Sequence, residues 1–171
     1  MVSFAESGLP ELLWSSMAEE GQDPWEIGRT RQAARTEDSD IVVIDEGTGT
    51  VAEMAGYVID SIPLPTDDMP ALFVPLQELE NLAPESWYVN VLSVYPDHRG
   101  KGHGTRLLEI AERIAREERL TRSSIIVADD NVGARRLYER CGYSKIAARQ
   151  AVREGWKTDT KQWILLIKDL D

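Results

Sequence analysis

Apolar residues recur along the chain at two spacings, which predict a mixed order of helices and strands. Near the amino end, Leu12, Leu13 and Met17 recur at roughly helical spacing. A second helix is expected from Asp23, a capping residue followed by proline, to about Thr36. The amino-terminal quarter of the chain is therefore expected to be largely helical.

Shorter apolar runs follow, and they are typical of strands. Ile41–Asp45 and Thr50–Ile59 are separated by glycines, so they predict an antiparallel hairpin. A proline-rich link over 62–84 contains Leu76–Asn81, which is long enough for one or two helical turns. Trp87–Tyr95 is rich in β-branched and aromatic residues and stops at a proline.

The second half of the chain alternates helix and strand. Thr105–Leu120 has apolar residues on one face and charged residues mostly on the other, and Asn131–Arg140 is a shorter helix. Ser124–Ala128, Ser144–Arg149 and Gln162–Lys168 predict strands, the first of them covered on both faces. The order predicts an α/β fold, with one mixed sheet and helices on both of its faces.

Length and composition limit the classes of function. A chain of 171 residues fits a single domain, 1–171, and its net charge of −11 argues against binding to nucleic acid. No apolar run reaches the length that spans a bilayer, and the start of the chain has no secretory signal pattern. The single cysteine, Cys141, fits a reducing compartment, so a cytoplasmic protein without a membrane contact is expected.

Charge is divided unevenly along the chain. Residues 1–84 carry a net charge of −14, and residues 85–171 carry +3. This division favours a cationic ligand for the first half and an anionic ligand for the second, and a simple solubility bias is the alternative.

The sharpest chemical feature is the run from Arg99 to Gly104, Arg-Gly-Lys-Gly-His-Gly, between a predicted strand and a predicted helix. Glycines let a ligand approach the backbone, and the unpaired amides of a helix start attract anions, so the turn suits a pyrophosphate. It lacks the Gly-x-x-x-x-Gly-Lys-Ser/Thr pattern of a P-loop. Its glycines, at alternate positions, also lack the Gly-x-Gly-x-x-Gly spacing of a dinucleotide fold.

Three segments in order resemble the GNAT superfamily of N-acetyltransferases. Arg99-x-x-Gly102-x-Gly104 is similar to its pyrophosphate loop, and Asn90–Arg99 to the strand leading into that loop. The frame Asn131-x-x-Ala134-x-x-Leu137-Tyr138-x-x-x-Gly142-Tyr143 resembles its downstream helix and turn. The resemblance implies a mostly antiparallel sheet with splayed central strands, and acetyl-CoA as the cosubstrate.

The resemblance also implies roles for individual residues. Tyr138 would protonate the leaving thiolate, and the backbone of the strand at Leu92 and Val94 would bind the pantetheine arm as an added strand. Asn131 would contact that arm and Ala134 would leave room for it, while Arg135 and Arg136 are either phosphate contacts or solvated surface. The implied coenzyme site comprises Leu92, Ser93, Val94, Arg99, Gly100, Lys101, Gly102, His103, Gly104, Thr105, Asn131, Ala134 and Tyr138.

The base that deprotonates the amine is left open by the sequence. Tyr88 stands where some protein-modifying members of the superfamily have a glutamate. The acids expected near the acceptor pocket are Glu53, Asp60, Glu78 and Glu80, and a water relay is an equal alternative.

Other reactive residues have simpler interpretations. Two histidines and one cysteine in no ligand spacing predict that there is no metal site, and Cys141 is expected to pack as a small buried residue. Trp14, Trp25, Trp87 and Trp156 line either an acceptor pocket or the core. The family's first strand is short, over 2–5, or missing, and the proline-rich segment 63–84 forms a pocket wall or a contact in a homodimer.

The sequence as a whole predicts an N-acetyltransferase that acts by direct attack in a ternary complex. The preferred acceptor is a small cationic amine, because of the acidic first half. The alternatives are a protein or peptide N-acetyltransferase and a non-catalytic acyl-CoA-binding module.

Overall fold

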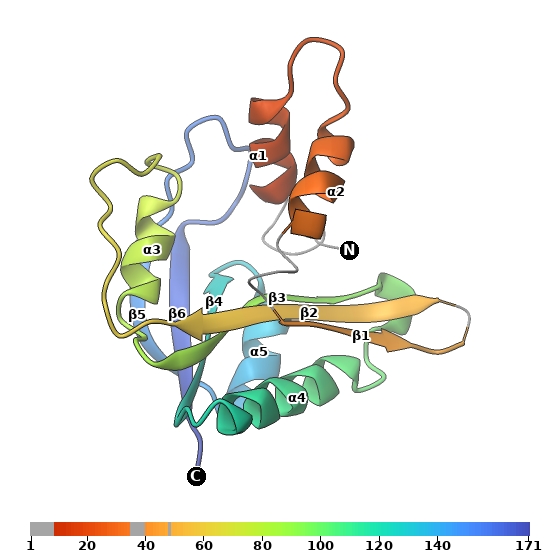
Figure 1. The fold of residues 1–171 in the computed structure, drawn as a ribbon, viewed down its shortest axis with the longest axis vertical. Coiled ribbons are helices and arrows are strands. Elements are labelled where there is room, and N and C mark those ends of the chain that lie inside the picture. The colour runs from red at the N-terminus through yellow and green to blue at the C-terminus, as the bar shows by residue number, and fades with distance from the viewer. Residues whose placement is uncertain (1–8, 35–39, 48) are drawn as a thin grey trace.

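The computed structural model describes residues 9–34, 40–47 and 49–171. These residues form one six-stranded sheet with helices on both faces, as the sequence predicts (Figure 1). The strands lie in the order β1-β2-β3-β4-β6-β5, which places β3 and β4 at the centre. Their bounds are β1 Asp40–Asp45, β2 Thr50–Ile59, β3 Ser86–Val94, β4 Arg122–Ala128, β5 Ser144–Gln150 and β6 Gln162–Asp169.

Neighbouring strands are antiparallel except for β3 and β4, which run parallel. Their ladder is short and its last pair is Val89 with Ile125. β3 then continues to Val94 and β4 to Ala128 without further pairing between them. The predicted splay of the central strands is therefore confirmed.

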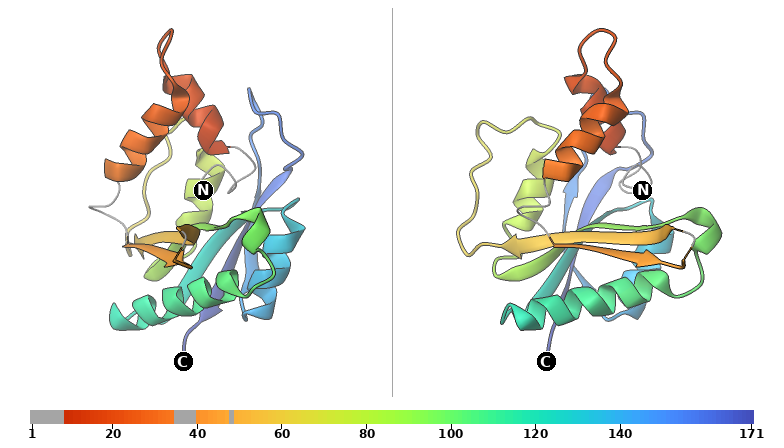
Figure 2. Two further views of the ribbon diagram at one scale, coloured as in Figure 1. Left: turned by 90° about the vertical axis from the view of Figure 1, so that its right-hand side faces the viewer. Right: turned by 45° about the vertical axis from the view of Figure 1, so that its right-hand side comes forward.

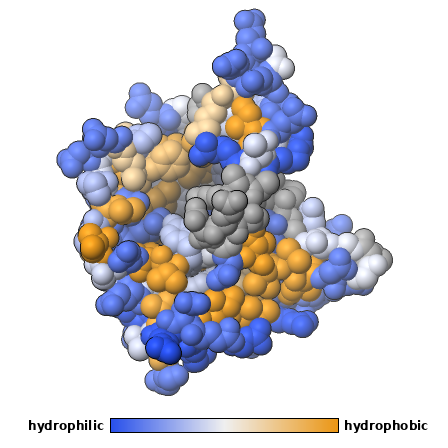
Figure 3. Space-filling model, viewed as in Figure 1, coloured by the Kyte–Doolittle hydropathy of each residue, from blue (hydrophilic) through white to orange (hydrophobic). Residues whose placement is uncertain are grey.

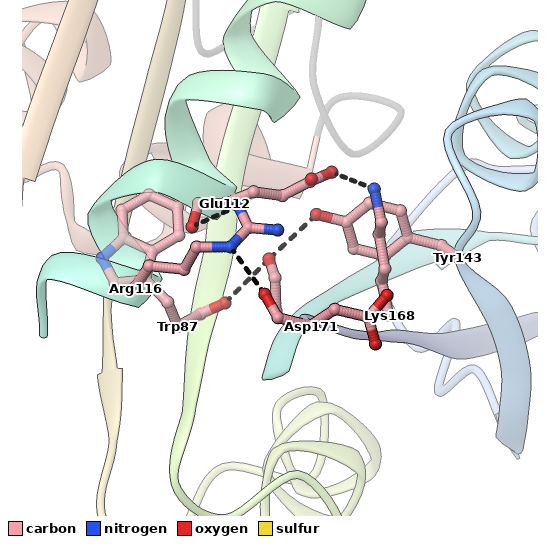
Figure 4. Close-up of polar contacts among 7 residues, drawn as sticks. Trp87, Glu112, Arg116, Tyr143, Lys168 and Asp171 are labelled. Atoms are coloured by element: carbon pink, nitrogen blue, oxygen red, sulfur yellow. Dashed lines mark hydrogen bonds and ion pairs between the residues drawn. The ribbon is translucent and has the colours of Figure 1, made fainter. Parts of the chain in front are cut away.

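Buried hydroxyl groups join β3 to β4 at the end where the two strands pair. The hydroxyls of Ser86 and Ser124 lie 2.7 Å apart. On the opposite face, Ser123 donates to the carbonyl oxygen of Trp87 at 3.2 Å and lies 2.9 Å from the phenol oxygen of Tyr143 (Figure 4). Because the one proton of Ser123 is given to Trp87, Tyr143 is the donor in that second bond. These bonds fix the point from which the strands diverge.

The same region ties the longest helix to the sheet. Burial raises the pKa of the Tyr143 phenol, so the hydroxyl stays protonated as a donor at neutral pH. Nearby, Lys168 Nζ lies 2.6 Å from the carboxylate of Glu112, and Arg116 donates to the carbonyl oxygen of Asp171 at 3.3 Å (Figure 4). These contacts hold the helix that contains Glu112 against β6 and the end of the chain.

The helices divide between the two faces of the sheet (Figure 2). α4 (His103–Glu117) and α5 (Val132–Arg140) pack on one face, in the larger apolar cluster. α3 (Val74–Glu80) and the start of α1 (Leu9–Met17) belong to the apolar cluster of the other face. α2 (Pro24–Ala34) packs on α1, where the rings of Trp14 and Trp25 meet edge-on with centroids 5.4 Å apart.

Alternation along β6 explains how one strand serves both clusters. Trp163, Leu165 and Ile167 join the cluster under α3, whereas Ile164 and Leu166 join the cluster under α4. Successive strand residues point to opposite faces, so an unbroken apolar run marks a strand that is covered twice.

Several element ends differ from the sequence prediction. α4 begins at His103, two residues before the predicted start, because Gly102 with a φ of +87° precedes it as the capping residue. The predicted helical turns in the proline-rich link are confirmed as α3. The predicted strand over 2–5 and the predicted helix end at Thr36 lie outside the described residues.

One apolar surface is open along the β1–β2 hairpin (Figure 3). Ile41 and Val43 of β1 are 45% and 52% exposed, and β1 is an edge strand of the described sheet.

None of the described helices has the length and apolar character needed to cross a membrane.

Candidate active site

A cavity of about 590 Å³ opens where β3 and β4 separate. The outer part of β3 forms one wall, the end of β4 with Trp163 of β6 forms the other, and the turn before α4 and the start of α5 complete it. The lining residues are Val89, Asn90, Leu92, Ser93, Val94, His98, Arg99, Gly100, Gly102, His103, Gly104, Thr105, Ile125, Ile126, Val127, Ala128, Asn131, Gly133, Ala134, Leu137, Tyr138, Arg140 and Trp163. Every predicted site residue except Lys101 therefore lines a single cavity.

The glycine turn presents backbone to this cavity. Gly100 and Gly102 have φ values of +76° and +87°, which side-chain-bearing residues rarely adopt, and the space where a Cβ would stand is open at both. The first backbone amide bonded within α4 is that of Arg106, to Gly102. The amides of the helix start before it are thus the ones available to a ligand. The turn has the geometry of an anion-binding site.

Gly104 has a different reason to be a glycine. A Cβ at this position would stand 2.7 Å from Leu137 of α5. The missing side chain lets α4 and α5 approach each other beside the cavity.

The two basic residues of the turn differ in position. Arg99 lines the cavity and donates through Nε to the carbonyl oxygen of Val94 at 3.2 Å, which fastens the turn to the end of β3. Lys101 lies outside the cavity lining, with its Nζ 3.4 Å from Nδ1 of His98. The sequence could not separate them, because both stand in the same short motif.

One face of α5 and its cap reach the cavity. Asn131 caps the helix, since its side-chain oxygen accepts from the amide of Ala134 at 3.2 Å. Ala134 and Tyr138 are one turn apart, so they share a face of the helix. Tyr138 is only 5% exposed, and its ring centroid is 6.4 Å from that of Tyr143. The predicted catalytic tyrosine is therefore buried on the cavity wall.

Three of the four acids considered for the base have defined local contacts. The contacts are Glu78 with Nε of Arg149 at 2.6 Å, Glu80 with the hydroxyl of Tyr57 at 3.0 Å, and Asp60 with the amide of Ser61 at 2.6 Å. Tyr88, which stands in the family glutamate position, is 3% exposed and packs edge-on against Tyr57.

Glu53 is distinct among these acids. Its Oε1 atom is buried without a hydrogen-bond partner among the described residues, and burial raises the pKa of its carboxyl above the ordinary value. Glu53 pairs directly with Ser93 across β2 and β3, and Ser93 lines the cavity. The neighbouring pair, Met54 with Leu92, packs into the cluster under α4, so Glu53 points to the opposite face.

The tryptophans, the arginines of α5 and Cys141 occupy different places relative to the cavity. Trp14 and Trp87 are buried, and Trp156 stacks on Trp163 with ring centroids 5.6 Å apart. None of the four predicted tryptophans lines the cavity, whereas Trp163 does, and neither Arg135 nor Arg136 lines it, whereas Arg140 does. Cys141 is half-buried at the end of α5 against the core and outside the cavity lining.

The histidines were expected to have no ligand spacing, and in sequence they have none. The fold nevertheless brings a third residue to them. His98 and His103 line the cavity, and each has a ring nitrogen 3.0 Å from an oxygen of Glu46, in the β1–β2 turn. The sequence does not single out Glu46, because only the β1–β2 hairpin places it beside residues more than 50 positions later.

Comparisons with known proteins agree with this architecture. The sequence model of the Acetyltransferase (GNAT) family matches residues 8–143. Among solved structures, a GNAT family acetyltransferase from Elizabethkingia anophelis with acetyl-CoA bound has 13% identity and a TM-score of 0.61, over 82% of each chain. Nourseothricin acetyltransferase has 19% identity and a TM-score of 0.60, over 80% of this chain and 68% of that one.

A third structure, the ribosomal-protein-S18-alanine N-acetyltransferase from Escherichia coli, has 16% identity and a TM-score of 0.59, over 94% of this chain and 88% of that one. At these identities the structures show a shared fold. No curated protein sequence gave a significant match.

Proposed function

Because the chain belongs to the GNAT family of acetyltransferases, we propose that it transfers the acetyl group of acetyl-CoA to the primary amine of a small cationic molecule. The 171 residues act as one domain, in a ternary complex and by direct attack. One observation supports this most strongly: the glycine turn, an unpaired stretch of β3 and a buried tyrosine meet in a single cavity.

The residues of the turn fit the diphosphate of coenzyme A. The open space at Gly100 and Gly102 is the space that a Cβ would fill, and phosphate oxygens can occupy it instead. The amides at the start of α4 and the positive end of its dipole face the same place. Arg99 adds charge at the cavity wall.

The gap between β3 and β4 fits the pantetheine arm. Beyond Val89, β3 has no ladder partner on the β4 side, so the backbone of Leu92 and Val94 can bond an extended amide-bearing chain. Ala134 keeps the α5 wall shallow, and the cap residue Asn131 stands at the rim.

Tyr138 donates the proton that the departing thiolate needs. A phenol carries its proton at neutral pH, and a thiol of pKa near 8.5 leaves more easily when it is protonated as the bond breaks. Tyr138 is 5% exposed and lines the cavity on the α5 wall.

Glu53 accepts the proton that the amine loses. Burial raises the pKa of its carboxyl, and a base works best when its pKa lies near the working pH. Glu53 and Tyr138 belong to opposite faces of the sheet. Donor and acceptor can therefore enter the gap between β3 and β4 from opposite sides.

The face of the sheet under α3, from which the amine would enter, carries groups that suit a cation. Residues 1–84 hold a net charge of −14, and the edge-on pair Tyr57–Tyr88 lies with Glu80 on the α3 side. Aromatic faces and carboxylates together attract ammonium groups. The fold alone does not choose the acceptor, since its neighbours are named for nourseothricin and for a ribosomal protein.

An amine panel tests this proposal. The panel contains a diamine, a polyamine, an aminosugar, a neutral amino-acid amide and a peptide with a free amino-terminal alanine, and released CoA thiol is measured. We expect turnover of the multiply charged amines above the amine-free background. Preference for the peptide would overturn the acceptor class, and tight CoA binding with no turnover of any amine would overturn the enzymatic role.

A further inference from the structure

Three potential metal ligands from separate segments converge beside the glycine turn. Glu46 comes from the turn between β1 and β2, His98 from the short helix η4 (Pro96–His98), and His103 is the first residue of α4. Oε2 of Glu46 is 3.0 Å from Nδ1 of His98, and Oε1 is 3.0 Å from Nε2 of His103. One ligand atom from each residue lies within 4.8 Å of the other two.

The chemistry and size of this cluster suit a divalent transition metal. Zinc binds imidazole nitrogen and carboxylate oxygen at about 2.0–2.2 Å, which in a tetrahedron separates neighbouring ligand atoms by about 3.3 Å. The two distances of 3.0 Å between a Glu46 oxygen and a histidine nitrogen are already close to that value. Rotation of the side chains can bring the two histidine nitrogens to a similar distance from each other. Hard cations such as magnesium prefer oxygen, so two imidazoles select against them.

Burial of the three side chains also favours a metal site. The side chains of His103, His98 and Glu46 are 12%, 26% and 37% exposed, so the protein shields most of the cluster and leaves part of it accessible to solvent. Nε2 of His103 is itself buried and makes no hydrogen bond of good geometry within the described residues, despite its closeness to Glu46. A metal ion would give this nitrogen a partner.

We propose that Glu46, His98 and His103 form a binding site for a zinc-like divalent cation that joins the β1–β2 turn to the glycine turn. Three protein ligands leave one coordination position, and because both histidines line the cavity, that position is on the cavity side. If the proposed function holds, the diphosphate of coenzyme A lies next to it, but the metal site itself does not depend on acetyl transfer.

Lys101 carries a positive charge that opposes a cation at this site. Its Nζ lies 3.4 Å from Nδ1 of His98, the proposed ligand atom. Lys101 is exposed at the surface, so its flexible side chain can move into water when a metal arrives. Lys101→Met removes this neighbour without removing a ligand, which makes it a suitable control.

Metal binding to the tag-free full chain, without coenzyme A, tests the proposal directly. His98 and His103 are the only histidines of the sequence, so alternative imidazole sites do not exist. We expect one zinc per chain by calorimetry, a visible absorption band with cobalt as the probe, and a zinc-dependent rise in Tm. Loss of an outer-shell partner costs about 10–100-fold in metal affinity, so His98→Ala, His103→Ala and Glu46→Ala should each weaken binding by at least about 100-fold.

The controls separate this site from general binding. Cys141→Ser, Glu118→Ala and Lys101→Met should retain one zinc per chain. Wild-type protein that binds no zinc, or ligand variants that bind it as wild type does, would overturn the site. Because no acetyl transfer is measured, a negative result here leaves the proposed function untouched, and the amine panel in turn leaves the metal site untouched.

Discussion

Proton affinities at single residues decide whether the cavity can carry out acetyl transfer. Phenols ionise near pH 10, so a buried tyrosine reaches the reaction with its proton in place. A carboxylate at its ordinary pKa of about 4.3 is a weak base for an ammonium group, and desolvation improves it. Tyr138 is buried on the cavity wall, and burial raises the pKa of the Glu53 carboxyl, so these two residues are the proposed acid and base.

Tyr138→Phe should lower turnover while leaving coenzyme binding intact. The substitution removes the proposed donor hydroxyl and keeps the ring, and losing a general acid typically costs about 10²–10⁴ in rate. Single-turnover kinetics and CoA calorimetry measure the two effects separately. Parallel losses of turnover and CoA affinity would remove Tyr138 from the acid role.

Glu53→Gln should abolish the acidic limb of the pH–rate profile. We expect the wild-type rate to rise with pH as the carboxyl ionises, over a pH range above the usual carboxylate range because burial raises the pKa of Glu53. The glutamine keeps the shape but cannot accept the proton, so we expect a loss of about 10² or more in rate.

Glu78→Gln is the matched control, since Glu78 is already paired with Arg149. A Glu53→Gln profile that superimposes on wild type would assign the base to another group or to water.

At the scale of elements, the glycine turn determines where α4 begins. The helical pattern of apolar residues predicts a start at Thr105, but the helix begins at His103 because Gly102 can adopt a positive φ. Periodicity reports which face of a helix is buried, not where the backbone can reverse. This is why the buried face of α4 was predictable from the sequence and its exact first residue was not.

Gly102→Val should weaken CoA binding by tenfold or more, which corresponds to about 1.4 kcal/mol. The substitution adds bulk where the diphosphate is expected, and it strains the backbone by about 1–3 kcal/mol. Gly155→Val is the control, because Gly155 has a φ of +74° and open space but lies outside the cavity. If both variants bind CoA with equal affinity by calorimetry, the turn is not the diphosphate site.

At the scale of the whole molecule, local motifs predicted the cavity well and long-range pairings poorly. The turn, the β3 residues and the α5 face lie within a stretch of about 50 residues, and their order was readable from the sequence. Trp163 reaches the cavity only because β6 inserts between β4 and β5, and Glu46 reaches the histidines only through the β1–β2 turn. Such contacts depend on strand order, which periodicity does not encode.

The hydroxyl hydrogen bonds between β3 and β4 determine how deep the opening between the two strands is. Two sets of hydrogen bonds fix the closed end of the opening, Ser86–Ser124 and Tyr143–Ser123–Trp87. The depth of the opening is therefore set by the number of strand residues beyond these bonds. Each residue of a strand advances about 3.3 Å. Moving these bonds by one residue pair along the strands would therefore change the depth of the opening by about this distance.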